Sequence, residues 1–218
     1  MVKHLVYPFH KNSCNEFPPA GVFEWLTDSG FYISDVFGLP EIHQIVVAIF
    51  KWNTRPLNEK EKKLSKAVFG DSIDLSLVRI DSDARLGTTK MALAYVSFHT
   101  INYRKQIKKE IFIHELMHVW QYQHFGSIYI ARAFKAQRSE EGYDYGGVAN
   151  LYQVMLRGGS LLEFNFEQQA DIIEDYYKIN THPDLAGSMQ LSIYRYFAKE
   201  LYYNTPDFEA TFTHSSKE

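Results

Sequence analysis

The feature that most constrains this chain is a pair of histidines four positions apart, His114 and His118, in an otherwise apolar segment. In an α-helix, residues four apart lie on the same face, so both imidazole rings can bind one ion. Glu115 lies at the margin of that face, where its carboxylate can reach a water on the ion without binding the ion tightly. The spacing therefore predicts a helical zinc site with two histidine ligands and Glu115 as general base.

The neighbours of this motif indicate that its helix is buried. Apolar side chains surround it on nearly every side: Ile111, Phe112, Ile113, Leu116, Met117, Val119 and Trp120. Histidine and glutamate are costly to bury there unless a metal or a charged partner compensates. Chance occurrence of the pattern is the alternative, and the apolar context argues against it.

A third ligand has two candidates, of which the first is His124. It lies ten residues after His114, the spacing of the metzincin class, but that class needs a midway glycine to break the helix, and Gln121 stands there. On an unbroken helix His124 is rotated by about 240° from His118 and faces away from the ion. Gly126, beyond His124, is the predicted end of the helix and agrees with this conclusion.

The second candidate is a later helix that carries Glu167 and Asp171, again four positions apart. One carboxylate can bind the metal while the other accepts the ring N–H of a liganding histidine, which orients the ring and raises its basicity. The small Ala170 allows close approach of the two helices. The alternative is an exposed acidic face that also includes Glu163, Glu174 and Asp175. Together with the upstream motif, the ligand role is the preferred interpretation.

Periodicity and punctuation predict a mainly helical chain of the α+β class in a single domain of residues 1–218. Helices are expected at residues 40–51, 59–69, 106–125, 128–136, 161–179 and 185–203. The second has Asn58 and Glu61 as a capping box and Gly70 at its end. Strands are expected at residues 73–80 and 91–98.

Glycine and proline predict the irregular parts of the chain. Residues 1–35 are expected to wrap irregularly around the core, and residues 206–218 to form a flexible tail. Polar loops are expected at residues 81–89 and in the glycine-rich connection of residues 137–160.

Composition excludes several classes of function. A formal net charge of -3 and a sequence pI near 6.3 give no long-range attraction for polyphosphate, so no nucleic-acid partner is expected. No apolar run approaches the roughly 18 residues needed to span a bilayer, so no membrane span is expected. The N-terminus lacks the apolar stretch of a secretory signal. The single Cys14 cannot form an internal disulfide, which fits folding in a reducing cytosol.

The combined pattern resembles the gluzincin group of zinc peptidases, in which His-Glu-x-x-His is followed tens of residues later by Glu-x-x-x-Asp. The resemblance implies a zincin-like fold, with a small mixed sheet next to the metal-binding helix, and Zn²⁺ as the cofactor. It also implies His114, His118 and Glu167 as ligands, Glu115 as the base and Asp171 as the partner of a liganding histidine.

A narrower resemblance spans about residues 57 to 178. Residues 57–59, 68–72 and 78–80, with the motif and its continuation to Gln121, are similar to the metallopeptidase domain associated with contractile injection systems, including Rhs- and Vgr-related proteins of type VI secretion loci. It implies an effector or processing enzyme, made in the bacterial cytoplasm without a signal peptide and exported by the contractile machine. The implied partners are a peptide or protein substrate, secretion-machine components and a cognate immunity protein.

The expected chemistry is hydrolysis of a peptide bond, with Glu115 passing a proton from water to the leaving amine. The strand at residues 91–98 is expected to align the substrate by strand addition. The residue that stabilises the oxyanion is open among six candidates, with the first three preferred: His182, Tyr145, Tyr143, Tyr152, Tyr176 and Tyr177. Two alternative functions remain: a non-catalytic accessory protein that keeps zinc for folding, and a peptidoglycan amidase or endopeptidase.

Overall fold

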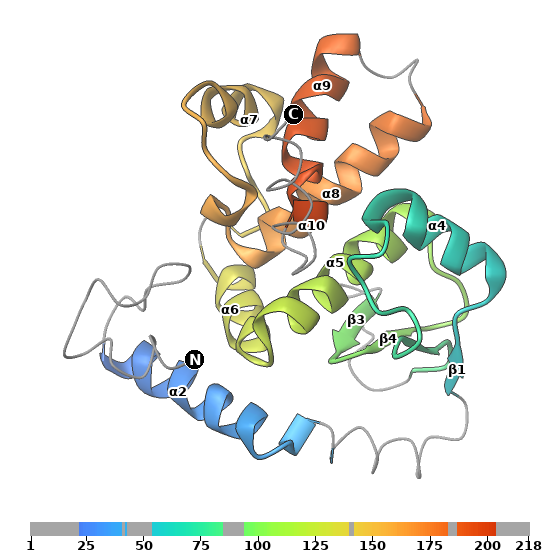
Figure 1. The fold of residues 1–218 in the computed structure, drawn as a ribbon, viewed down its shortest axis with the longest axis vertical. Coiled ribbons are helices and arrows are strands. Elements are labelled where there is room, and N and C mark those ends of the chain that lie inside the picture. The colour runs from blue at the N-terminus through green and yellow to red at the C-terminus, as the bar shows by residue number, and fades with distance from the viewer. Residues whose placement is uncertain are drawn as a thin grey trace, which may run out of the picture.

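A computed structural model describes residues 22–40, 42, 54–84, 94–139, 142–182 and 187–203. Figure 1 shows the elements in their spatial arrangement. In chain order they are α2 (Val22–Val36), β1 (Thr54–Pro56), α4 (Glu59–Phe69), β2 (Arg79–Asp81), β3 (Ala94–Ser97), β4 (Thr100–Tyr103), α5 (Lys109–Phe125), α6 (Ile128–Gln137), α7 (Gly147–Leu156), η2 (Leu161–Glu163), α8 (Phe166–Thr181), α9 (Ser188–Ala198) and α10 (Glu200–Tyr203). The expected α+β class, mainly helical with a small mixed sheet, is confirmed.

Four short strands form one sheet in the order β1-β2-β4-β3. β2 runs antiparallel to β1 and parallel to β4, and β3 runs antiparallel to β4. In the part of the chain that the structure describes, β3 therefore lies at one edge of the sheet, where it packs against α5. The expected strand at residues 91–98 is confirmed over Ala94–Ser97, while residues 91–93 lie outside the described part.

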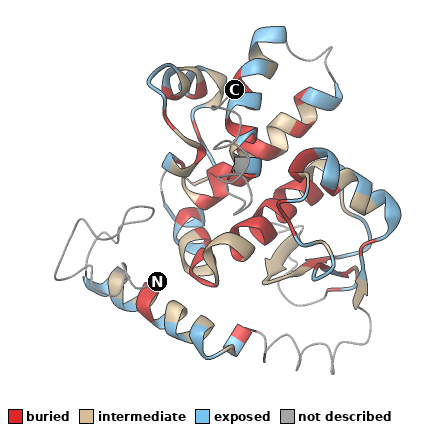
Figure 2. Ribbon diagram, viewed as in Figure 1, coloured by how far each residue is buried: buried red, intermediate tan, exposed pale blue. Residues whose placement is uncertain are grey.

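The motif helix α5 runs through the core, and its residues from Phe112 to Tyr122 are all buried (Figure 2). It packs against α4, α6, α8 and the strands β3 and β4. Ile113, Leu116 and Trp120 are almost completely enclosed, and burial of each such side chain contributes about 1.5–3 kcal/mol. This packing holds the backbone of the motif in one position relative to α8 and to the sheet.

Within the described residues, we find no helix with the length and apolar composition needed to cross a bilayer.

Capping signals placed several helix ends correctly. The Asn58 side chain accepts a hydrogen bond from the Glu61 backbone, and the Glu61 carboxylate accepts one from the Asn58 backbone, so the capping box begins α4 as predicted. Gly70 and Gly126 follow α4 and α5 with φ of 58° and 75°, a range that favours glycine. The helix expected at residues 128–136 is confirmed as α6.

The expectation of an irregular N-terminal segment is wrong where the structure describes it, because α2 is a regular helix. Tertiary contacts hold it against α6. The buried Asp28 pairs with Arg132, and the Asp35 carboxylate accepts a hydrogen bond from the Ser127 backbone at 2.9 Å. The prolines that suggested irregular structure precede α2 and lie in residues 1–21, outside the described part.

The strand expected at residues 73–80 is also wrong, because only Arg79–Asp81 forms β2. Asp74 accepts hydrogen bonds from the Ser76 backbone and hydroxyl at 2.9 and 2.6 Å. Such a side-chain turn competes with extended strand pairing. The strands β1 and β4 were not predicted.

The C-terminal helices differ from prediction mainly in their bounds. The helix expected at residues 161–179 is divided, because Asn165 caps a new helix, α8, after the short η2. The helix expected at residues 185–203 comprises α9 and α10, and residues 183–186 lie outside the described part. The glycine-rich connection contains α7. The predicted helix at residues 40–51, apart from residues 40 and 42, and the predicted tail also lie outside the described residues.

Candidate metal centre

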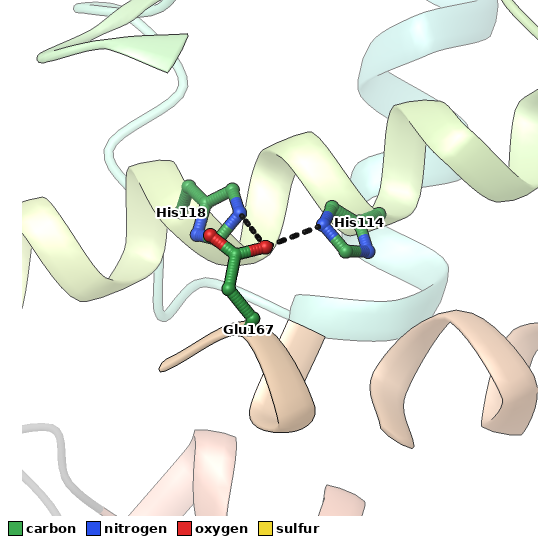
Figure 3. A group of neighbouring side chains, drawn as sticks. All are labelled: His114, His118 and Glu167. Atoms are coloured by element: carbon green, nitrogen blue, oxygen red, sulfur yellow. Dashed lines mark ion pairs between the residues drawn. The ribbon is translucent and has the colours of Figure 1, made fainter. Parts of the chain in front are cut away.

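Three side chains of the ligand type meet where α5 crosses α8 (Figure 3). Nε2 of His114 and Nε2 of His118 each lie 3.6 Å from the same oxygen, Oε2 of Glu167. All three residues are buried, and their ligand atoms lie within 4.8 Å of one another. Ala170, the small residue expected to permit close approach of the helices, is completely buried on α8. The arrangement is one that can bind a metal ion.

The distances fit a shared cation better than they fit hydrogen bonds. A nitrogen–oxygen separation of 3.6 Å is too long for a hydrogen bond. Two ligands at about 2.0–2.1 Å from a tetrahedral zinc ion are roughly 3.3–3.4 Å apart. Oε2 of Glu167 and Oε2 of Glu115 are buried without a hydrogen-bond partner among the described residues. Because unpaired buried carboxylate oxygens are costly, a bound cation would compensate for them. Two imidazole nitrogens and a carboxylate oxygen are ligand types that zinc accepts.

The His118 ring is oriented by Gln121, one turn further along α5. Nδ1 of His118 lies 2.8 Å from Oε1 of Gln121. The amide nitrogen of Gln121 donates to the Phe166 carbonyl at 2.9 Å and to Oε1 of Gln169 at 3.0 Å, so its oxygen is the atom left to face the histidine. An acceptor at Nδ1 selects the tautomer protonated there and leaves Nε2 available to a metal.

The His114 ring faces two carboxylates. Its Nδ1 lies 3.0 Å from Oδ1 of Asp171 and 3.2 Å from Oε2 of Glu174, although it forms a well-aligned hydrogen bond with neither. Asp171 thus lies where a partner of a liganding histidine was expected. Glu174 does not belong to an exposed acidic face, because its side chain is largely buried and points to the same site. Lys178 pairs with Glu174 at 2.8 Å.

The carboxylates of this cluster favour positive charge on its two histidines. Burial lowers the pKa of His114, but neighbouring carboxylates, Asp171 foremost, outweigh burial and raise it well above its usual value. Burial also lowers the pKa of His118, and Glu167 more than reverses that effect. Burial raises the pKa of Glu167, but the two histidines outweigh burial and bring that pKa well below its usual range. Burial raises the pKa of Glu115.

The cluster opens into a cavity of about 670 Å³. Glu115 and the three ligand-type residues line it together with Asp171 and Glu174. The wall contributed by α6 is largely apolar and includes Ile130, Ala133 and Phe134, and the edge strand contributes Ala94, Tyr95 and Val96. The strand predicted to align a substrate is therefore part of the cavity wall.

Of the six residues considered for oxyanion stabilisation, Tyr143 lines this cavity. Burial first, and then the Glu167 carboxylate, raise the pKa of Tyr143. The preference for Tyr145 is corrected by its position: its hydroxyl donates to Asp175 at 2.5 Å and pairs with Tyr194 at 2.6 Å. The Tyr145 hydroxyl is therefore hydrogen-bonded within the core and does not face the cavity.

The preference for His182 is also corrected by the structure. His182 is exposed at the C-terminal end of α8, where its Nδ1 lies 3.1 Å from the Thr181 hydroxyl. It lies eleven positions after Asp171, roughly 16 Å along a helix axis. The remaining three candidates, Tyr152, Tyr176 and Tyr177, are not among the cavity-lining residues either.

His124 faces away from the cluster, as helical geometry predicted. Its ring stacks on Trp120 with a centroid separation of 4.1 Å, and its Nδ1 lies 2.8 Å from the Trp120 carbonyl oxygen. Burial lowers the pKa of His124. The described geometry gives it no place in the candidate centre.

Comparison with known proteins gives a partial likeness. The chain is 33% identical over 137 residues to the type VI secretion system spike protein VgrG2b of Pseudomonas aeruginosa. The likeness covers 56% of this chain and 13% of the spike protein, so the chain spans only a small part of that relative's length. No family model matches the chain, and no solved structure matches it.

Sequence reasoning missed three polar residues at the centre. Gln121 and Glu174 each follow a predicted site residue by three positions, a spacing that places them on the same helix face and was available as a signal. Gln137 donates to Oε1 of Glu167 at 2.9 Å from α6. Nothing local in the sequence marks Gln137, because its contact depends on how α6 packs against α8.

Proposed function

We propose that the protein is a zinc-dependent metallopeptidase with a zincin-like fold that serves a type VI secretion system as an effector or processing enzyme. The convergence of His114, His118 and Glu167 beside the buried Glu115 carries this proposal. The likeness to VgrG2b supports the link to the secretion machine. Its restriction to a small part of that spike protein fits a module that a spike carries.

The mechanism assigns a role to each group at the centre. His114, His118 and Glu167 would hold the ion. When bound, zinc supplies a Lewis acid that polarises the peptide carbonyl and lowers the pKa of water. Glu115 accepts the proton of the attacking water and transfers it to the leaving amine. Tyr143 donates a hydrogen bond to the oxygen of the attacked carbonyl as negative charge develops on it.

The apolar α6 wall and the edge strand suit an extended peptide. A peptide that adds to β3 has its backbone groups paired with the strand, while alternate side chains enter the cavity. The same cavity contains the ligand-type residues, so an added strand passes beside them. This geometry favours a peptide or an unfolded protein segment as substrate.

The test combines metal analysis with cleavage. Protein purified without chelator should contain close to one zinc per chain, and His114→Ala should not. With a mass-spectrometric peptide library, the wild type should produce cleavages that Glu115→Gln does not, while Glu115→Gln retains zinc, because the amide is nearly isosteric but cannot accept the proton.

The possible outcomes separate the alternatives. A wild type without zinc refutes the metal centre. Equal cleavage by wild type and Glu115→Gln refutes the role of the base. Zinc in both proteins with cleavage by neither favours the accessory role, in which the metal serves folding alone. The secretion link is tested by release of the protein from a host bacterium with and without a working contractile sheath, and sheath-independent release contradicts it.

A further inference from the structure

The glycine-rich loop of residues 142–147 and the start of α8 share the side chain of Asn165. Its Oδ1 caps α8 by accepting hydrogen bonds from the backbone N–H groups of Glu167 and Gln168 at 3.0 and 2.9 Å. Its Nδ2 donates to the carbonyl of Gly142 at 3.0 Å. One side chain thus begins the helix that carries the glutamate of the centre and also holds the loop.

Gln168 makes the matching connection on the other side of Tyr143. Its Oε1 accepts the Asn165 backbone N–H at 3.1 Å, and its Nε2 donates to the carbonyl of Asp144 at 2.8 Å. The backbone on both sides of Tyr143 is therefore tied to the first turn of α8. Gln168 is itself buried, which strengthens these bonds relative to bonds in water.

Tyr145 anchors the same loop a second time. Its buried hydroxyl donates to Asp175 of α8 and pairs with Tyr194 of α9. Gly142 and Gly146 have φ of 48° and 77°, so the chain can turn sharply on either side of the two tyrosines. Tyr143 stands between these anchors, and the residue is 45% exposed.

We propose that Asn165 and Gln168 are positioning residues that lock Tyr143 over the metal position, so that its hydroxyl is preorganised to stabilise the oxyanion. This inference rests on the proposed peptidase function. The Tyr143 ring lines the cavity with its centroid 6.3 Å from that of His114. An exposed tyrosine on an unanchored glycine-rich loop samples many positions, whereas a donor held in place needs no reorganisation as charge develops.

We call the hydrogen bonds from Asn165 and Gln168 to the loop of residues 142–147 the clamp. Hydrogen–deuterium exchange tests the clamp without requiring activity. Asn165→Ser retains a capping oxygen but loses the amide donor to Gly142, and Gln168→Met removes the donor to Asp144 at similar side-chain length. Amides of residues 142–147 should exchange about tenfold faster or more in both variants. Asn58→Ser makes the same change at the N-cap of α4 and should leave the loop unchanged. Zinc affinity should stay within about twofold in all three variants, because none removes a ligand or the orienting partner of one. Unchanged loop exchange in Asn165→Ser and Gln168→Met overturns the clamp.

Kinetics on a peptide selected from the library tests the role of Tyr143. Tyr143→Phe should lower kcat by about 100- to 1000-fold with little change in KM, zinc affinity or loop exchange. Asn165→Ser and Gln168→Met should lower kcat by roughly tenfold, and combining either with Tyr143→Phe should cause no further loss, because both act through that hydroxyl.

The results that overturn the inference differ from those that overturn the function. Full kcat in Tyr143→Phe, or additive losses in the double variants, refutes the role of the clamp in catalysis while leaving the peptidase intact. Loss of zinc from Tyr143→Phe assigns the hydroxyl to metal binding, and this result also refutes the proposed role of the clamp in catalysis. A wild type that binds no zinc or cleaves no peptide refutes the proposed function, and the catalytic role of Tyr143 with it.

Discussion

Gln121 provides a direct test of how the two packed helices orient a ligand-type histidine. The side chain is completely buried and joins Nδ1 of His118 to the Phe166 carbonyl and to Gln169. Gln121→Met preserves side-chain length and approximate volume, but the thioether neither accepts strongly from the imidazole nor donates to the two oxygens. The change therefore removes the polar contacts and leaves most of the packing.

Two effects are expected. Loss of the acceptor at His118 Nδ1 should weaken zinc binding by about 10- to 100-fold, which corresponds to about 1.4–2.7 kcal/mol. In the zinc-free protein, the Phe166 carbonyl and Oε1 of Gln169 lose their donor, at a cost of about 1–3 kcal/mol for each unsatisfied group. We expect the free energy of unfolding to fall by at least about 2 kcal/mol.

The assay is competition for zinc with a chromophoric chelator, together with urea unfolding of the zinc-free protein. Gln123→Met is the matched control, because the same residue type two positions later on α5 bonds instead to the backbone of Asp74. It should leave zinc affinity nearly unchanged. If folded Gln121→Met binds zinc within about twofold of the wild type, or no more weakly than Gln123→Met does, the orienting role of Gln121 is refuted.

The remaining predictions concern ligation and pH. In the same titration, with circular dichroism to verify folding, Glu167→Ala should lose most zinc binding, Asp171→Ala should weaken it about 10- to 100-fold, and His124→Ala should leave it nearly unchanged. Retention in Glu167→Ala with loss in His124→Ala would overturn the ligand assignment. Glu174→Gln should weaken zinc binding less than Asp171→Ala, because the Glu174 charge is already paired with Lys178, and a larger effect contradicts this reasoning. The melting temperature of the zinc-free protein should fall as pH rises above about 6.5, since both motif histidines have raised pKa values in the folded state. Their stabilisation is complete below the unfolded pKa and is lost as pH rises through the folded pKa. Zinc-loaded protein should show the opposite slope, because zinc binding displaces protons, and parallel slopes in calorimetry would refute this account.

Features contained within one helix could be predicted from the sequence. The spacing of His114 and His118 places them on one face, and the same periodicity turns His124 towards Trp120. The capping box at Asn58 determined where α4 begins for a similar reason. Helical periodicity and caps depend on backbone geometry over a few residues, so neither needs knowledge of the tertiary fold.

Contacts between helices could be predicted only as candidates. The spacing of Glu167 and Asp171 by itself also allowed an exposed acidic face, and only its combination with the upstream motif favoured the ligand role. The packing of α8 against α5 brings both carboxylates towards the histidines. Glu174 lies on the same face of α8 and faces His114, whereas the alternative interpretation of the sequence placed it on an exposed acidic face. Short-range pattern shows which residues share a face, but not which partner that face meets.

Only the tertiary structure distinguished Tyr143 from Tyr145, which are two positions apart in one glycine-rich loop. Tyr145 turns inward because its hydroxyl finds partners on α8 and α9, 30 and 49 residues further along the chain. Strands β1 and β4 and helix α2 were hidden for the same reason. The strands are only three and four residues long. β1 pairs with the distant β2, and β4 pairs with β2 as well as with its neighbour β3, while α2 is held by ion-pair and hydrogen-bond partners on and beside α6. Interactions across such separations depend on the assembled fold, so no local pattern in the sequence reports them.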